Sequence, residues 1–296
     1  MALAGHLPTP LLLALARTAG HLAGRLPLAR RDALRENMAH LAPVRSAAQR
    51  ERLVRQAFVH LLEGATDLWR LPSLAARHDH SRATHARRAD TLEALAAIEG
   101  REHLDAALAL GQGVIAVTPH LGPYELGGAL LARLGYPVHA VVERLDEATL
   151  AALARYRAAT GMALVPRDVG ARPLLRLLRD GQVVLLVADR VVGGGESLIV
   201  PFGNGARRVP TGPAALALAS GAPVLVGSIV RVVGESARYR VRLEPPLLAD
   251  RTGDAARDRE ALTRRLAQRL AALATAHPEQ WFVFQPDWLP RDDEPR

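Results

Sequence analysis

A histidine and a glutamate separated by four residues, His120 and Glu125, are the side chains with the clearest potential for chemistry. An imidazole held through one ring nitrogen by a carboxylate can take a proton on the other, and the carboxylate stabilises the imidazolium that forms. Such a pair acts as a general base toward a hydroxyl group. The alternative is a histidine that only caps or packs at the start of a helix, because this spacing also occurs by chance.

The residues around this pair predict where it lies in the fold. Val114–Val117 is a short, continuous apolar run, typical of a strand buried on both faces. The Gly-Pro pair at 122–123 ends it, and a helix is predicted from about Tyr124 to Arg133. We therefore expect His120 at the carboxyl end of a strand, where open α/β sheets bind ligands, and Glu125 in the first turn of the next helix.

A second candidate binding element is the start of a later helix. Arg207 and Arg208 lead to Thr211, the predicted N-cap of the apolar helix Ala214–Ser220. A helix N-terminus preceded by two arginines attracts a phosphate or a developing oxyanion. An ordinary capped core helix is the alternative. The glycines at 193–195 predict a flexible connection rather than a phosphate loop, because no Lys-Ser or Lys-Thr follows them.

Composition narrows the classes of partner. The 296 residues contain no lysine and no cysteine, and the formal net charge is +8. Without cysteine, disulfides, thiolate metal sites and a cysteine nucleophile are excluded. The net positive charge indicates a polyanionic partner, which is a nucleic acid, an anionic membrane surface or a phosphorylated cofactor. A coding bias toward arginine explains part of the arginine count, but not its excess over acid. The cluster His78, Asp79, His80 and His85 lacks the regular spacing of a zinc site, so we expect no metal.

The chain has one amphipathic segment suited to a membrane surface. In residues 10–28, Leu12, Leu13, Leu15 and Ala16 share a face, and Arg17, His21 and Arg25 recur on another. Such a helix either lies in the membrane interface or packs on its own domain. The uncharged run 209–230 is broken by Pro213 and Pro223, and the N-terminus lacks a signal-peptide pattern. We therefore expect a cytoplasmic protein, and these patterns leave open whether it sits on a membrane.

The order of elements predicts an α/β fold with a mostly parallel central sheet flanked by helices, in a single domain over residues 1–296. Residues 1–110 should be a helical N-terminal region, in which Pro72 stops a helix that begins near Ala47. Residues 111–296 should form the α/β core, because strand-like and helix-like segments alternate there. The strands are expected at 114–117, 138–142, 163–167, 182–188, 224–232 and 239–243, and further helices at 101–110, 150–159, 171–179 and 258–276.

Five motifs in order resemble the bacterial lipid A biosynthesis acyltransferases (lauroyl and myristoyl type) and the related phosphatidylinositol mannoside acyltransferases. The motifs are His120-Leu121-Gly122-Pro123-Tyr124-Glu125, Val187-Ala188-Asp189-Arg190, Pro201-Phe202-Gly203, Pro210-Thr211-Gly212-Pro213-Ala214 with Ser220-Gly221-Ala222-Pro223, and His277-Pro278-Glu279-Gln280-Trp281. The resemblance implies transfer of a fatty acyl group from acyl-CoA or acyl carrier protein to a hydroxyl of a glycolipid or phospholipid, without a cofactor. It also implies a peripheral protein at the cytoplasmic face of the membrane. It makes His120 the base and Glu125 the residue that orients it.

The same resemblance implies the groups that bind the substrates. The oxyanion would be met by backbone N–H groups near Gly122 or Thr211 and by the guanidinium of Arg144 or Arg190. The substrate-binding set it implies is Arg144, Asp189, Arg190, Arg208, Thr211 and Gly212. An arginine-lined mouth would also receive the phosphates of the donor or an acidic carrier protein.

The acceptor and the alternatives to catalysis stay open at this point. The ending Gln285-Pro286-Asp287-Trp288 is similar to that of the mannoside enzymes, whereas Glu125 is the choice of the lipid A enzymes. Val191 replaces an acid that often follows Ala-Asp-Arg. A catalytically silent lipid-binding membrane protein is the main alternative, and a thioesterase is a neighbouring one. A nucleic-acid-binding protein is disfavoured, because aromatic residues are few and no recognition motif is present.

Overall fold

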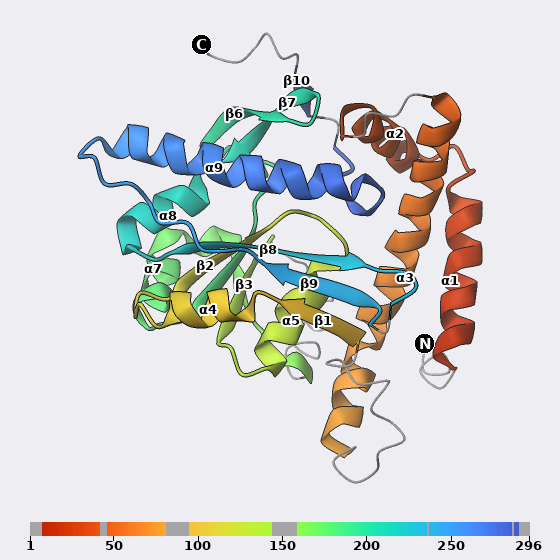
Figure 1. Ribbon diagram of the computed structural model, residues 1–296, viewed down its shortest axis with the longest axis horizontal. Helices are drawn as coiled ribbons and strands as arrows, with labels where there is room; N and C mark the ends of the chain where they lie inside the picture. Colours follow the sequence, from red (N-terminus) through yellow and green to blue (C-terminus); the bar gives the residue numbers. More distant parts are fainter. Residues whose placement is uncertain are drawn as a thin grey trace.

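The computed structural model in Figure 1 describes residues 8–41, 46–80, 95–143, 159–235, 237–285 and 287–289, with the backbone alone for 72–80. A seven-stranded sheet forms its centre, in the order β1-β9-β8-β2-β5-β3-β4. The strands are β1 (Ala96–Glu99), β2 (Val114–Thr118), β3 (Val138–Val142), β4 (Ala163–Pro166), β5 (Val183–Val187), β8 (Val224–Arg231) and β9 (Tyr239–Leu243). The five from β8 to β4 run parallel, and β9 turns back antiparallel on β8. The prediction of a mostly parallel sheet is confirmed.

Helices cover both faces of this sheet because its central strands are apolar on both sides. Every residue of β2 is buried. Ile115 and Val117 face a core built with α7 (Ala171–Arg179), α8 (Gly212–Ser220) and α9 (Ala255–Ala276). Val114 and Ala116 face the opposite core, which α4 (Arg101–Leu108) and α5 (Tyr124–Arg133) complete. In Figure 1, α9 crosses above the sheet while α4 and α5 lie below it.

The N-terminal region is helical, as predicted, with two differences in detail. It consists of α1 (Thr9–Ala23), α2 (Ala29–Leu41) and α3 (Ala47–His80). The prediction that Pro72 ends the third helix is wrong, because the backbone continues helically to His80. A proline removes one hydrogen bond from a helix and can bend it without ending it. Strand β1 also falls within the segment expected to be helical, and it pairs in parallel with β9. Its four residues are too few to show a clear strand pattern. The helix expected at 150–159 lies almost wholly outside the described residues.

The N-terminal helices are fixed to the sheet by close packing and buried charges. A Cβ atom on Gly20 of α1 would lie 2.6 Å from the Cα of Val59 in α3, so the two helices touch through backbone. Glu63 of α3 accepts a bond of 2.6 Å from Arg17 of α1 and pairs at 2.8 Å with Arg231 of β8. These contacts join the helices to one end of the sheet, beside the strands that turn back.

A small second sheet lies over the carboxyl end of the central strands. It contains β6 (Ser197–Phe202), β7 (Gly205–Pro210) and β10 (Trp288–Leu289), all antiparallel. Figure 1 shows it above α9, next to α2. The sequence did not predict these strands. They bring the tryptophan-rich C-terminal segment, which also contains the short 3-10 turn η6 (Pro278–Gln280), over the end of β2.

Candidate active site

The turn after β2 presents His120 at the carboxyl end of the sheet, as the sequence predicted. Gly122 has φ +58°, and a Cβ atom there would lie 2.2 Å from the carbonyl oxygen of Ile229 in β8. Only glycine adopts this conformation so close to a neighbouring strand. The N–H of Gly122 donates to the carbonyl of Gln280, and the N–H of Phe282 donates to the carbonyl of His120. The C-terminal segment therefore holds the turn in place from outside.

The carboxylate that contacts His120 is Asp189, from the neighbouring strand. Thr118 of β2 pairs with Val187 of β5, so His120 and Asp189 each lie two residues beyond a registered pair. Nδ1 of His120 is 2.5 Å from Oδ1 of Asp189, and the backbone N–H of His120 donates to Oδ2 at 2.7 Å. The indole N–H of Trp281 donates to the same Oδ2 at 2.7 Å. Asp189 is fully buried, while 13% of the His120 side chain is exposed.

These contacts define the protonation of the imidazole. Burial acts to raise the pKa of Asp189, but the charge and hydrogen bonds of His120 and the bond from Trp281 outweigh it, and the pKa is lowered. The carboxylate is therefore an acceptor, and Nδ1 carries the proton. The Nε–H of Arg190 lies 3.2 Å from Nε2 of His120. With Nδ1–H held on Asp189, Nε2 is the nitrogen that can take a proton, and Arg190 lies beside it.

Arg190 is itself held by two partners. One terminal nitrogen donates to Oε1 of Gln285 at 3.0 Å, and the other pairs with the carboxylate of Glu143. The guanidinium is thus fixed next to Nε2 of His120, with 17% of the side chain exposed. A positive group at this place can stabilise negative charge that develops next to Nε2.

Glu125 lies close to His120 without occupying Nδ1. It is in the first turn of α5, as predicted. Burial raises the pKa of Glu125, and a hydrogen bond from Tyr124 and the charge of His120 act against that rise. The ring of Tyr124 meets the imidazole edge to face at 5.3 Å. At Nδ1 the ring is bonded by Asp189, which was expected to bind substrate and is closed off from solvent. The expectation that Glu125 orients His120 stays a prediction.

Comparison of the sequence with known proteins shows the family to which this chain belongs. The sequence pattern of a family described as bacterial lipid A biosynthesis acyltransferase matches residues 1–290. The chain belongs to this family. The phosphatidylinositol mannoside acyltransferase of Mycobacterium tuberculosis is 32% identical over 263 residues, which cover 87% of this chain and 77% of that protein. The corresponding protein of Mycolicibacterium smegmatis is 28% identical over 87% of this chain and 79% of its own length. A lipid A biosynthesis acyltransferase of Haemophilus influenzae is 25% identical over 62% of this chain and 55% of its own length.

The other residues expected to bind substrates of this acyltransferase are placed differently. Arg208 is exposed on β7, and Gly212 is exposed at the start of α8. Thr211 occupies the N-cap position, but its side chain does not cap the helix and instead contacts Glu196. The backbone N–H groups of Gly122 and Thr211 already donate to the carbonyls of Gln280 and Glu196. These two N–H groups are therefore not free to meet an oxyanion, and Arg190, next to His120, is a described candidate. Arg144 lies outside the described residues, as do the side chains of the His78–His80 segment and His85.

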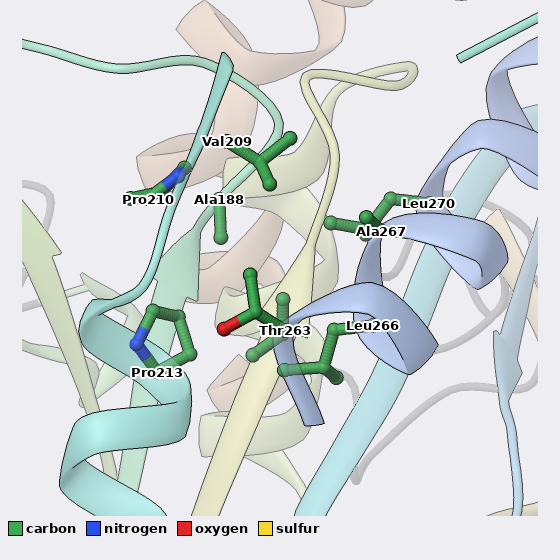
Figure 2. Close-up of a pocket in the computed structure, with 9 residues that line it drawn as sticks. Ala188, Val209, Pro210, Pro213, Thr263, Leu266, Ala267 and Leu270 are labelled. Atoms are coloured by element: carbon green, nitrogen blue, oxygen red, sulfur yellow. The ribbon is translucent and has the colours of Figure 1, made fainter. Parts of the chain in front are cut away.

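A small apolar cavity lies directly behind the site. Figure 2 shows Ala188, the neighbour of Asp189, facing Thr263 and three apolar residues of α9 across this space, with Val209 and Pro213 at its side. Its volume of about 10 Å³ is close to the minimum that holds one water molecule. The cavity does not admit a fatty acyl chain as it stands.

Sequence reasoning missed two residues that complete the site. Trp281 is fully buried and binds Asp189 directly, although the sequence marked it only as part of an aromatic segment. Arg207 was expected to face a phosphate, yet its side chain is fully buried between indole rings. The available signal was that His120 and Asp189 each follow a buried strand. Side chains at the carboxyl ends of two neighbouring parallel strands lie close together. In the described residues, no group of three histidines and acids is arranged to hold a metal ion.

Proposed function

We propose that this chain transfers a fatty acyl group from a thioester donor, acyl-CoA or acyl carrier protein, to a hydroxyl of a glycolipid, with His120 as the general base. The observation that carries the proposal is the contact of Nδ1 of His120 with buried Asp189, which leaves Nε2, beside Arg190, as the nitrogen that can take a proton. Membership of an acyltransferase family supports the class of reaction.

The proposed reaction needs no covalent enzyme intermediate, because the thioester is already activated. The acceptor hydroxyl takes the place of Arg190 at Nε2 and gives its proton to that nitrogen as its oxygen attacks the thioester carbonyl. Asp189 stabilises the imidazolium. The displaced guanidinium of Arg190 meets the oxyanion of the tetrahedral intermediate. Collapse breaks the carbon–sulfur bond, and the proton on Nε2 passes to the leaving sulfur, so that an ester and a thiol leave.

The relatives favour a mannosylated inositol phospholipid as the acceptor. Two of them are named phosphatidylinositol mannoside acyltransferases, and they cover more of this chain than the lipid A relative does. The C-terminal segment that resembles those enzymes is part of the site, since Gln285 binds Arg190. A polyhydroxylated headgroup presents many hydroxyls of similar acidity, so position rather than reactivity would select one of them.

We also propose that α1 binds an anionic membrane surface. Its inner side packs on α3 through Leu13, Ala16 and Gly20. Large apolar side chains remain exposed along its outer side and the following turn, at Leu11 (47%), Leu15 (55%), Leu22 (57%) and Leu26 (52%). Helices with exposed leucines and nearby arginines bind the headgroup region of anionic bilayers. None of the described helices is both long enough and apolar enough to cross a bilayer.

Activity is tested with radiolabelled palmitoyl-CoA or palmitoyl carrier protein and purified mannosylated phosphatidylinositol. We expect an acylated product with wild type and a loss of turnover of about 10³-fold or more in His120→Ala, since the base is removed. His139→Ala is the matched control, because this histidine of β3 bonds only Gln182, away from the site. Equal turnover in wild type and His120→Ala would refute the proposed mechanism. Labelled free fatty acid without acylated lipid would indicate a thioesterase.

Membrane binding is tested by sedimentation with vesicles that contain phosphatidylglycerol. We expect Leu15→Glu combined with Leu22→Glu to lower the bound fraction strongly, because each charge must enter the interface. Leu248→Glu is the matched control, since this leucine is also 56% exposed but lies far from α1 in the sequence and outside the N-terminal helices. Unchanged binding of the double variant would contradict the role of α1.

A further inference from the structure

Arg207 is a fully buried cation without a hydrogen-bonding partner in the part of the chain that the structure describes. None of its three nitrogens has an acceptor there. Its guanidinium carbon lies 5.1 Å from the centre of the Trp281 ring and 4.7 Å from that of Trp288. Two indole faces stabilise a cation, but they do not replace the hydrogen bonds lost on burial. The burial of a charge without these hydrogen bonds is costly, which indicates that Arg207 has a role other than packing.

The indole of Trp281 connects this cation to the catalytic histidine. Its face is turned to Arg207, and its N–H donates to Oδ2 of Asp189. The opposite charges of Arg207 and Asp189 attract each other. Burial lowers the pKa of Arg207, and the attraction of Asp189, followed by Asp287 and Glu36, acts against that decrease. His40, stacked on Trp288 at 4.2 Å, is the remaining titratable group near this cation.

A buried carboxylate beside an imidazole creates a problem for a general base. Removed from water, the negative charge of Asp189 favours the imidazolium, and a protonated His120 has no lone pair with which to accept a hydroxyl proton. A second charge of opposite sign close to the carboxylate reduces this pull. The Nε atom of Arg190 lies 3.2 Å from Nε2, the nitrogen that must keep its lone pair for this role.

We propose that Arg207 is a positioning residue for the acyl transfer: its charge, packed against Trp281 and Trp288, balances that of Asp189 and leaves His120 neutral and able to act as a base. This inference rests on the proposed function for its role in catalysis. The other charged and titratable groups that face His120 are Arg190, Glu125 and Tyr124. Arg190 is paired with Glu143, so its charge is balanced locally. Arg207 packs over the face of the indole whose N–H binds the carboxylate, and within the described residues it has no such pair.

The test compares Arg207→Met, which keeps the bulk and removes the charge, with Arg207→Lys, which keeps the charge. The first measurement is nuclear magnetic resonance of the His120 ring as a function of pH, which does not require turnover. In Arg207→Met we expect the ring to take up its proton at a pH higher by about one unit or more, because a buried cation has been removed. Arg207→Lys should stay within about half a unit of wild type on the same reasoning.

The second measurement is the pH dependence of turnover. The acid limb should move to higher pH in Arg207→Met, with a loss of about tenfold or more on that limb and a smaller loss at high pH. Arg264→Met, at an exposed arginine of α9 paired with Glu260, is the control. Arg207→Gln replaces the Met variant if that variant does not fold.

The outcomes separate this inference from the proposed function. A folded Arg207→Met or Arg207→Gln variant in which His120 titrates as in wild type would overturn the inference and assign Arg207 a structural role. The same conclusion follows if turnover decreases equally at every pH. A shifted His120 titration in a protein without acyltransferase activity would support the charge balance and refute the proposed function.

Discussion

Replacing Asp189 by asparagine should reverse the protonation of His120, for a reason specific to this site. Two donors, the backbone N–H of His120 and the indole N–H of Trp281, converge on Oδ2. The amide oxygen of the introduced asparagine must take that position, because an amide nitrogen there would face two donors. The NH₂ group is then directed at Nδ1, which can accept its hydrogen only if the ring proton moves to Nε2. The atom proposed to take the substrate proton would already carry one.

The expected loss is large for turnover and modest for stability. A wrong tautomer with unchanged geometry costs about 10³- to 10⁴-fold in related catalytic arrangements, or about 4–5.5 kcal/mol of transition-state stabilisation. The free energy of unfolding should decrease by about 1–3 kcal/mol, because charge-assisted hydrogen bonds to a buried carboxylate become neutral ones. The assays are acyl transfer from labelled donor, denaturant unfolding, and ¹⁵N correlation spectra that report which ring nitrogen is protonated.

Asp105→Asn provides the matched control. Asp105 also accepts a short hydrogen bond, from Tyr136 at 2.5 Å, but it is partly exposed on α4. Turnover should be unchanged there. If Asp189→Asn keeps turnover within tenfold of wild type, or keeps the proton on Nδ1, then Asp189 does not set the tautomer and the proposed role of Nε2 is wrong.

Three further changes test the framework of the site. Gly122→Ala should lower the free energy of unfolding by more than about 3 kcal/mol, measured by denaturant unfolding, because positive φ and a backbone clash at 2.2 Å act together. Glu125→Gln should raise Tm at neutral pH and lose that advantage on acidification, since burial raises the pKa of Glu125 and the folded state disfavours its charge. Glu51→Gln should do the opposite, because hydrogen bonds and charge from Arg35 lower the pKa of Glu51, and its stabilising effect is present above the ordinary glutamate range. Equal Tm changes for the two glutamine variants across pH would contradict this assignment of charges.

Local sequence was sufficient to place His120, because strand, turn and helix follow one another within twenty residues. The apolar run of β2, the Gly-Pro break and the helix beginning at Tyr124 each have a direct physical cause. The alternation of such units also predicted the parallel sheet and its helices. Pro72 shows the limit of local rules, since the backbone of α3 stays helical through it to His80.

The partner of His120 could not be predicted from spacing along the chain, because it depends on which strands become neighbours. Glu125 is close in sequence and was the natural choice, yet α5 leads it to a buried position beside Tyr124 rather than to Nδ1. Asp189 lies sixty-nine residues away. It reaches the ring because β5 is hydrogen-bonded to β2 in a register that sets both residues two positions beyond the same rung.

The position of Arg207 behind the site also depends on which distant segments become neighbours, so its role could not be predicted from the sequence. Arg207 is one of many arginines in a chain without lysine, so its type carries no information. Its role becomes apparent only in the folded chain, where β7 and the C-terminal segment pack it against Trp281 and Trp288. A buried aspartate is needed to direct the proton of His120 to Nδ1, and the more deeply it is buried, the more strongly it favours a charged ring. An opposite charge near the aspartate relieves this conflict without exposing the site to water, whereas a hydrogen-bonded arginine would compete with His120 for the carboxylate oxygens. An indole between the two charges satisfies both conditions, since it donates one hydrogen bond to Asp189 and presents its face to the cation.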